Sequence, residues 1–75
     1  MSYNGYKNYE TWNINLWVQN EERSYWYMVE NRPYNKTTAF CRALEMYPDG
    51  TPDMESAEDY NKVNWSEIAE IWNEE

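Results

Sequence analysis

The sequence predicts an all-α fold, a small single-domain bundle of four to five short helices around an aromatic core. Apolar residues recur at intervals of three and four in most segments, and Asn or Thr residues that can cap helices stand before them. The chain also has 8 Tyr, 5 Trp and 1 Phe in 75 residues, so rings must supply much of the core. A chain of this length has room for one core, and we expect a single helical domain over residues 1–75.

The first helix is predicted to begin at Tyr9, after an arm or loop at residues 1–7 whose tyrosines are expected to fold back onto the domain. Asn8 can cap this helix. The segment that follows holds two tryptophans and several branched aliphatic residues, so we expect it to form the first layer of the core. Within residues 11–18 a helical spacing and an alternating strand pattern both occur. We prefer the helix, because a lone strand would have no partner for its backbone groups.

Two further helices are predicted in the middle of the chain. Asn20 followed by two glutamates is typical of a helix N-terminus, and this run ends at Pro33. Asn35 or Thr37 can cap the next helix, which has the clearest amphipathic pattern in the chain. The residues expected on one face are Tyr25, Met28, Val29 and Arg32 in the first of these helices, and Phe40, Ala43, Leu44 and Tyr47 in the second.

A turn and a short helix are predicted to follow. Gly50 lies in the turn, where a positive φ suits glycine. Thr51 offers a helix cap, Pro52 suits the first helical position, and Asp53 adds an acid to the first turn. We therefore predict a helix over roughly 52–60.

The last helix is predicted over about 65–74, with a variant of the capping box at its start. Asn64 is placed to accept from the Glu67 amide while the Glu67 carboxylate reaches back, and Val63 and Ile68 occupy the positions of a hydrophobic staple. The helix is expected to turn Trp65, Ile68, Ala69 and Trp72 inward, and Glu67, Glu70 and Glu74 outward.

Negative charge is concentrated in the last third of the chain. Residues 1–48 contain five acids and five bases, which cancel. Residues 49–75 contain nine acids and one base, Lys62, so the whole net charge of −8 arises there. Such a segment can simply keep a domain soluble, or it can meet a positively charged partner.

The composition argues against catalysis and metal binding. The chain has no His and a single cysteine, Cys41, which excludes an internal disulfide and a zinc site built from Cys and His. Cys41 stands beside Phe40 and is expected to be buried. The acids around Gly50 lack the spacing of a calcium loop. We therefore predict no enzyme activity, no catalytic residues, no metal and no cofactor.

Membrane and nucleic-acid binding are also not predicted. No apolar run approaches the roughly 20 residues needed to cross a bilayer, and the N-terminus lacks the features of a secretory signal. The 6 bases are scattered among 14 acids, which disfavours direct contact with phosphates. We expect a soluble, cytoplasmic protein.

Two blocks of the sequence resemble a family of small uncharacterised proteins that recurs in bacteriophages, plasmids and bacterial accessory genes. The first block is Asn8-Tyr9-Glu10-Thr11-Trp12-Asn13 with Leu16-Trp17-Val18 and Gln19-Asn20-Glu21, and the second is Val63-Asn64-Trp65-Ser66-Glu67-Ile68-Ala69-Glu70. The middle of the chain, about 23–62, matches only loosely. The family has no established activity, so the resemblance implies a mobile-element setting in a bacterial host and no catalytic residues.

These observations favour an acidic interaction protein that inhibits a host defence complex, such as a CRISPR effector or a restriction enzyme. Its carboxylates would imitate phosphates and bind the basic surface of the host protein. The alternative is a helical adaptor or homodimer that binds protein through exposed aromatic rings. The residues predicted to carry the first function are Asp49, Asp53, Glu55, Glu58, Asp59, Glu67, Glu70 and Glu74, with Tyr60 or Trp65 as an aromatic anchor.

Overall fold

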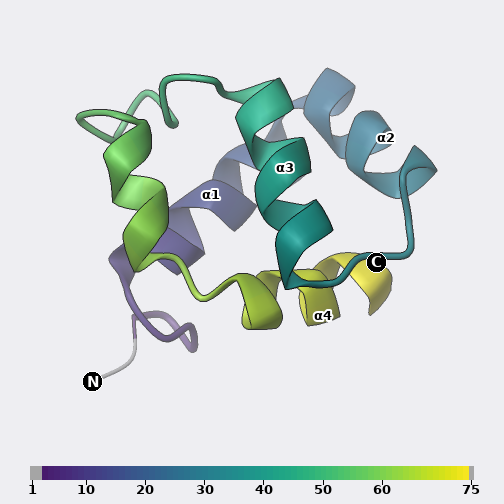
Figure 1. The fold of residues 1–75 in the computed structure, drawn as a ribbon, viewed down its shortest axis with the longest axis horizontal. Coiled ribbons are helices and arrows are strands. Elements are labelled where there is room, and N and C mark those ends of the chain that lie inside the picture. The colour runs from purple at the N-terminus through teal and green to yellow at the C-terminus, as the bar shows by residue number, and fades with distance from the viewer. Residues whose placement is uncertain (1–2, 75) are drawn as a thin grey trace.

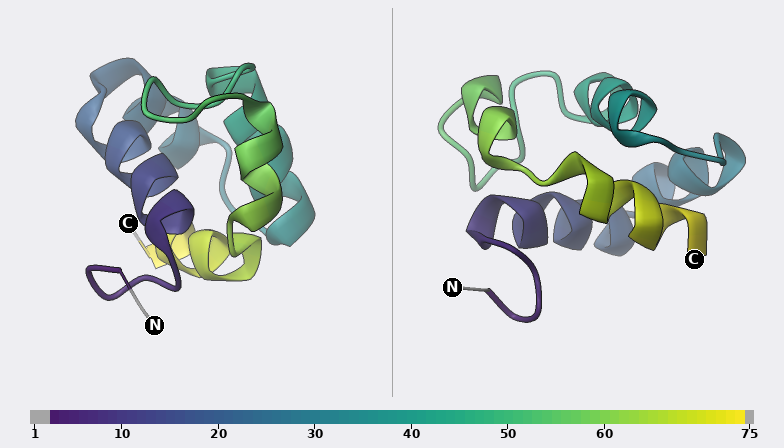
Figure 2. Two further views of the ribbon diagram at one scale, coloured as in Figure 1. Left: turned by 90° about the vertical axis from the view of Figure 1, so that its left-hand side faces the viewer. Right: turned by 60° about the horizontal axis from the view of Figure 1, so that its bottom comes forward.

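A computed structural model describes residues 3–74, and it confirms the predicted all-α fold (Figure 1). Across this range the chain forms four α-helices and one 3-10 helix. α1 packs against α2, and α3 packs against α4. Figure 2 shows α3 and η1 on one side of the molecule, with α1 and α4 on the other. The bounds are α1 Tyr9–Asn20, α2 Glu22–Glu30, α3 Lys36–Met46, η1 Ala57–Lys62 and α4 Trp65–Glu74.

The segment with the ambiguous pattern is a helix, α1, and it begins where the sequence predicts. Asn8 caps it: its Oδ1 accepts from the backbone N–H of Thr11 at 2.9 Å and from the Thr11 hydroxyl at 2.6 Å. The side-chain amide of Asn8 also donates to the carbonyl of Lys62 at 2.7 Å, which ties the start of α1 to the end of η1. One residue therefore serves both as a helix cap and as a link to the far end of the chain.

α1 contributes polar side chains to the interior, which the sequence did not predict. The segment does contribute to the core, as expected, but through Ile14 and Val18, because its two tryptophans are only partly buried. The Trp17 indole N–H donates to Asp53 near the surface, and Trp12 packs against the rings of Tyr3 in the arm and Tyr9 on α1. The buried residues of α1 are Thr11, Asn13, Ile14, Asn15 and Val18.

The core is aromatic, but its largest rings come from the second half of the chain. Trp72 is fully buried, and Tyr60 is 1% exposed. The Trp72 ring contacts Tyr34 edge-on with 5.2 Å between centroids, and its indole N–H donates to Oδ1 of Asn15 at 3.0 Å. The buried apolar residues are Ile14, Val18, Met28, Tyr34, Ala39, Ala43, Met54, Tyr60, Val63, Ile68, Ala69 and Trp72.

The described part of the arm folds back as predicted, whereas residues 1 and 2 lie outside the described range. Tyr3 and Tyr6 exchange two backbone hydrogen bonds, of 2.6 and 2.8 Å, around a tight turn. Asn4 and Gly5 take positive φ values of 49° and 87° there, which is typical of two-residue hairpin turns. The Tyr6 hydroxyl then accepts from the side-chain amide of Asn15 at 2.8 Å, so the arm is attached to α1.

The middle helices follow the predicted pattern closely. α1 continues through Asn20, and α2 begins at Glu22 with Glu21 before it, so the predicted start of α2 shifts by one residue. Of the two candidate caps for α3, the structure uses Asn35, whose side chain accepts from the Thr38 N–H at 2.9 Å. The Thr38 hydroxyl accepts from the Asn35 N–H at 2.9 Å and completes a capping box.

The predicted helix over roughly 52–60 is wrong in start and in type. η1 is a 3-10 helix that begins at Ala57, and the Ser56 hydroxyl caps it by accepting from the Glu58 N–H at 3.2 Å. No helix begins directly after Thr51, which is buried and whose hydroxyl donates to Oδ1 of Asn13. The positive φ expected at Gly50 is present, at 90°.

α4 has its predicted bounds, and Asn64 caps it by accepting from the Glu67 N–H at 3.1 Å. The reciprocal half of the predicted capping box does not form. The Asn64 N–H instead donates to Oγ1 of Thr11 at 2.9 Å, and the Glu67 carboxylate accepts from the Lys7 N–H at 3.1 Å. Ile68, Ala69 and Trp72 are buried as expected, whereas Trp65 is partly exposed.

Candidate functional site

The predicted acidic residues lie on three consecutive parts of the fold. Some lie in the connection between α3 and η1, some on η1, and the rest on α4. In Figure 1 the connection and η1 form one side of the molecule, and α4 runs along the bottom toward the other side. The three groups are Asp49, Asp53 and Glu55 in the connection, Glu58, Asp59 and Tyr60 on η1, and Glu67, Glu70 and Glu74 on α4.

Asp53 is exposed, but its carboxylate is also hydrogen-bonded to α1. Its Oδ2 accepts from the side-chain amide of Asn13 and from the indole N–H of Trp17, each at 2.9 Å. These two donors favour the ionised carboxylate and hold the pKa of Asp53 below its ordinary value. Asp53 therefore fixes the connection onto α1.

Two other predicted acids also make contacts within the chain. Asp59 accepts from the Glu55 N–H at 3.1 Å and forms an ion pair with Lys62 at 3.6 Å. Glu67, expected to face outward, accepts from the Lys7 N–H at 3.1 Å and is only partly exposed. These contacts attach η1 to the connection and the arm to α4.

Tyr60 is not a surface anchor. Its ring is buried between Phe40 and Trp65, with 6.2 Å to the first centroid and 5.5 Å to the second. Its hydroxyl donates to the Tyr47 carbonyl at 2.8 Å, and burial raises the pKa of Tyr60 above its ordinary value. The prediction that its ring contacts a partner is therefore wrong for this position, because η1 turns that side chain into the core.

Six of the predicted acids are exposed, and the five other than Asp53 form a distinct set. Among residues 3–74, no hydrogen bond or ion pair of the chain involves their carboxylates. They fall into two groups, because η1 and the C-terminal half of α4 lie on different sides of the molecule (Figure 1). The first group is Asp49, Glu55 and Glu58, and the second is Glu70 and Glu74.

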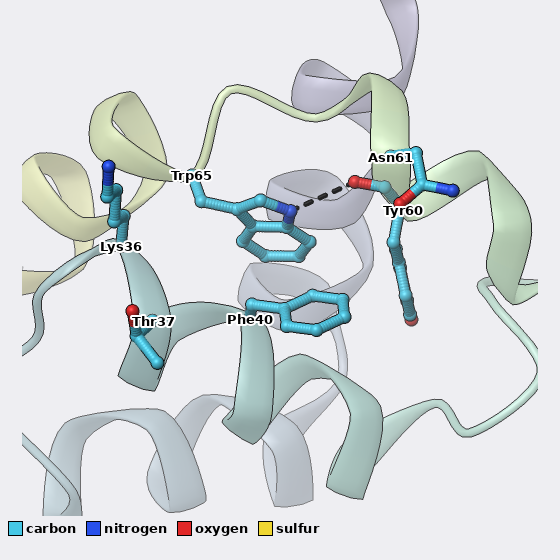
Figure 3. A pocket seen from close by; sticks show the side chains of 6 residues that line it. All are labelled: Lys36, Thr37, Phe40, Tyr60, Asn61 and Trp65. Carbon is cyan, nitrogen blue, oxygen red and sulfur yellow. Dashed lines mark hydrogen bonds between the residues drawn. The ribbon is translucent and has the colours of Figure 1, made fainter.

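A shallow groove beside η1 is a second candidate surface. Its volume is about 300 Å³, and its floor is formed by the rings of Phe40 and Trp65. The Trp65 indole N–H donates to the Tyr60 carbonyl at 2.9 Å, which fixes the ring, and the two floor rings meet edge-on at 5.4 Å. Figure 3 shows Lys36 and Thr37 on one side of these rings and Asn61 on the other. The sequence placed Phe40 on a core face and offered Trp65 both as a core residue and as a surface anchor, but it did not predict that the two rings line one groove.

A cavity of about 550 Å³ between α2 and α3 has a more polar lining. Glu45 accepts there from the Tyr27 hydroxyl and from Arg42, whose guanidinium nitrogen lies 3.0 Å from each carboxylate oxygen. The Tyr27 hydroxyl and then Arg42 hold the pKa of Glu45 below its ordinary value. The charged residues that line the cavity are two acids and one base, Glu21, Glu45 and Arg23.

Cys41 is exposed, which corrects the prediction of burial. It lies on the side of α3 opposite the buried Ala39 and Ala43. Within the described range, no group of three or more Asp, Glu or Cys side chains could hold a metal ion. Nor does that range contain a helix long and apolar enough to cross a membrane.

The comparisons with known proteins identify a family. The family of unknown function DUF7249 matches the chain over residues 1–75, and the chain belongs to it. No curated protein matches the chain, and no solved structure matches it. This agrees with the resemblance to an uncharacterised family and supplies no activity or site residues.

Proposed function

We propose that this member of the DUF7249 family is a non-enzymatic inhibitor that binds a basic surface on a host complex handling nucleic acid. A CRISPR effector or a restriction enzyme is the partner that this chemistry suggests. The protein would be encoded by a mobile element and act in the cytoplasm of the bacterial host. It would need no cofactor, and it would contact the host protein rather than the nucleic acid itself.

The observation that carries the proposal is that some acids of residues 49–59 are hydrogen-bonded within the fold and the others are not. Asp53 and Asp59 hold the backbone through hydrogen bonds, whereas Asp49, Glu55 and Glu58 extend into solvent. Charges on a fixed backbone lose little freedom when they meet a partner, and this favours binding. An acidic segment that only improved solubility would not need two of its acids to fix its shape.

We propose a smaller binding site than the one predicted from the sequence. Asp49, Glu55 and Glu58 would make the main contacts with the partner, because the connection and η1 lie next to each other in the fold (Figure 1). Glu70 and Glu74, on the far half of α4, would contact only a partner large enough to reach around the molecule. Complementary charge of this kind accelerates association and makes binding sensitive to salt.

A DNA-binding competition assay tests the proposal. A purified CRISPR effector and a purified restriction enzyme are each mixed with their DNA target, with and without this protein. We expect the protein to displace DNA from one of them, with inhibition that weakens as salt rises from 50 to 300 mM in steps of ~50 mM, since screening shortens the reach of charges.

Two charge-reversal variants sharpen the test. E55K/E58K should lose inhibition by about tenfold or more, because two attractive contacts become repulsive. The matched control is E22K/E30K, which reverses two exposed acids on α2, away from η1. Inhibition that ignores salt, or that both double variants lose equally, would contradict phosphate imitation by this segment.

A further inference from the structure

One exposed ring on the molecule has no partner in the fold beyond its sequence neighbour. Trp26, on α2, is 54% exposed, more than any other large hydrophobic residue of the described chain, and Tyr25 touches it edge-on at 5.4 Å. An exposed tryptophan leaves a large apolar area in water, which is unfavourable unless another surface covers it.

Charged residues surround Trp26 on its face of α2. Glu22 and Glu30 stand four residues before and after it, so their side chains lie on the same side of the helix, and both are exposed. Arg23 stands three residues before it and is also exposed. The surface is therefore a single large ring with a carboxylate on either side along the helix and one guanidinium nearby.

The groove beside η1 has the complementary features. Its floor of two rings suits another aromatic ring, because edge-to-face and offset contacts between rings are favourable. Its volume of about 300 Å³ suits one large side chain. Lys36 is the one charged residue among the six that line it, and among residues 3–74 its side chain makes no ion pair.

We infer that the protein self-associates by placing Trp26 of one copy in the Phe40–Trp65 groove of a second copy, where Lys36 meets Glu22 or Glu30. The α2 surface offers a ring between two carboxylates, and the groove offers two rings beside an ammonium group, so the two surfaces are complementary. A single inserted ring buries far less than a standard interface, and the net charge of −8 on each copy opposes association. The association is therefore weak and visible only at high protein concentration.

Sedimentation equilibrium of the full chain, at concentrations up to roughly 1 mM, measures this association. The expected result is reversible self-association of the wild-type protein. W26A should weaken it by roughly thirtyfold, the size expected of a central aromatic anchor. K36E should weaken it by about tenfold. K7E is the matched control, because it reverses an exposed lysine on the arm and should leave association unchanged.

A charge swap identifies the contact. K36E alone and E22K/E30K alone should each associate about tenfold more weakly than wild type, since each puts like charges together. Mixing the two variants should restore association, because every Trp26 face then meets a groove of opposite charge. In a two-dimensional NMR spectrum, the indole N–H signals of Trp26 and Trp65 should shift with concentration, and that of buried Trp72 should not.

Other outcomes would overturn the inference. A wild-type protein that stays monomeric throughout the series excludes it. Association that persists in W26A, or that the mixed variants fail to restore, places the contact elsewhere. The test does not depend on the proposed inhibition, because it measures association of the chain with itself and is decided by W26A and K36E, whereas inhibition is measured with a different partner and is decided by E55K/E58K.

Discussion

The side-chain amide of Asn13 donates to Oδ2 of Asp53 at 2.9 Å and joins two segments 40 residues apart in the sequence. Asn13 is fully buried, and its own oxygen accepts from the hydroxyl of buried Thr51. One asparagine therefore holds both ends of the short stretch 51–53 against α1. Because the exposed acids lie on either side of that stretch, Asn13 helps to set the shape of the proposed binding segment.

Replacing Asn13 with alanine should destabilise the protein by about 3 kcal/mol, because the buried Thr51 hydroxyl would lose its partner and a cavity would form. Urea unfolding followed by tryptophan fluorescence measures the change. Asn61, which is exposed on η1, provides the control, and N61A should stay within about 0.5 kcal/mol of wild type. Similar stabilities of N13A and N61A would show that Asn13 does not hold the segment.

The ionisation of Asp53 should contribute to stability at neutral pH. Its pKa in the folded protein is lowered by the Asn13 amide and the Trp17 indole. The unfolded chain therefore takes up the proton first as pH falls, at an ordinary pKa of ~3.9. The contribution is complete above that value and is lost as pH drops through the lower folded pKa.

Unfolding free energies measured between pH 7 and pH 3 check this dependence. Wild type should lose stability at the acid end, and D53N should lose less over the same range because position 53 no longer titrates. Equal losses in the two proteins would assign the acid sensitivity to other groups, such as Glu45, whose pKa is also lowered.

Trp72 is fully buried and Trp26 is the most exposed large hydrophobic residue of the described chain, so replacing each with phenylalanine should change stability by different amounts. W72F should destabilise the fold by about 2 kcal/mol, because it removes buried area and leaves Oδ1 of Asn15 without the indole donor. W26F should change stability by less than about 0.5 kcal/mol, since that ring is exposed. Thermal melts monitored by circular dichroism at low protein concentration compare the two, and a larger loss for W26F would be inconsistent with the packing described.

The two glycines allow backbone strain to be separated from steric conflict. Both have positive φ, 87° at Gly5 and 90° at Gly50. A Cβ at Gly5 meets nothing within 4 Å, whereas at Gly50 it would lie 2.9 Å from the Ser56 carbonyl oxygen. G5A should therefore cost about 1 kcal/mol from strain, and G50A should cost more, about 3 kcal/mol. Chemical denaturation of both variants gives the difference, and equal costs would mean that the connection can move away from the new methyl group.

The sequence predicted helices well wherever local chemistry decides. Asn8, Asn35 and Asn64 all cap the helices that follow them, and each does so through a hydrogen bond within one turn. The helical spacing of apolar residues also identified Ile68 and Trp72 as core residues. These signals lie within a few residues of each other, so they can be read without knowing the rest of the fold.

The errors arise where distant partners decide. Thr51 has the chemistry of a cap, but it is buried against Asn13 and no helix begins directly after it, and Ser56 caps η1 instead. Asp53 looks like a surface acid until its two donors on α1 are known. The Ser56 hydroxyl, two residues before Glu58, was a local signal that could have suggested the later start. No local signal indicates which acids find donors 36 to 40 residues away.

Hydrogen bonds join the beginning and the end of the chain at several points: Asn8 to Lys62, Thr11 to Asn64, and Asn15 to Trp72. The two sequence blocks that resemble an uncharacterised family are thus neighbours in space. During synthesis on the ribosome, α2 can pack against α1 early, but α1 lacks its contacts with residues 62–72 until those residues emerge. The native contacts between the two blocks can therefore form only after residues 62–72 have emerged, and nascent chains that stall earlier would expose this side of α1 to chaperones and proteases.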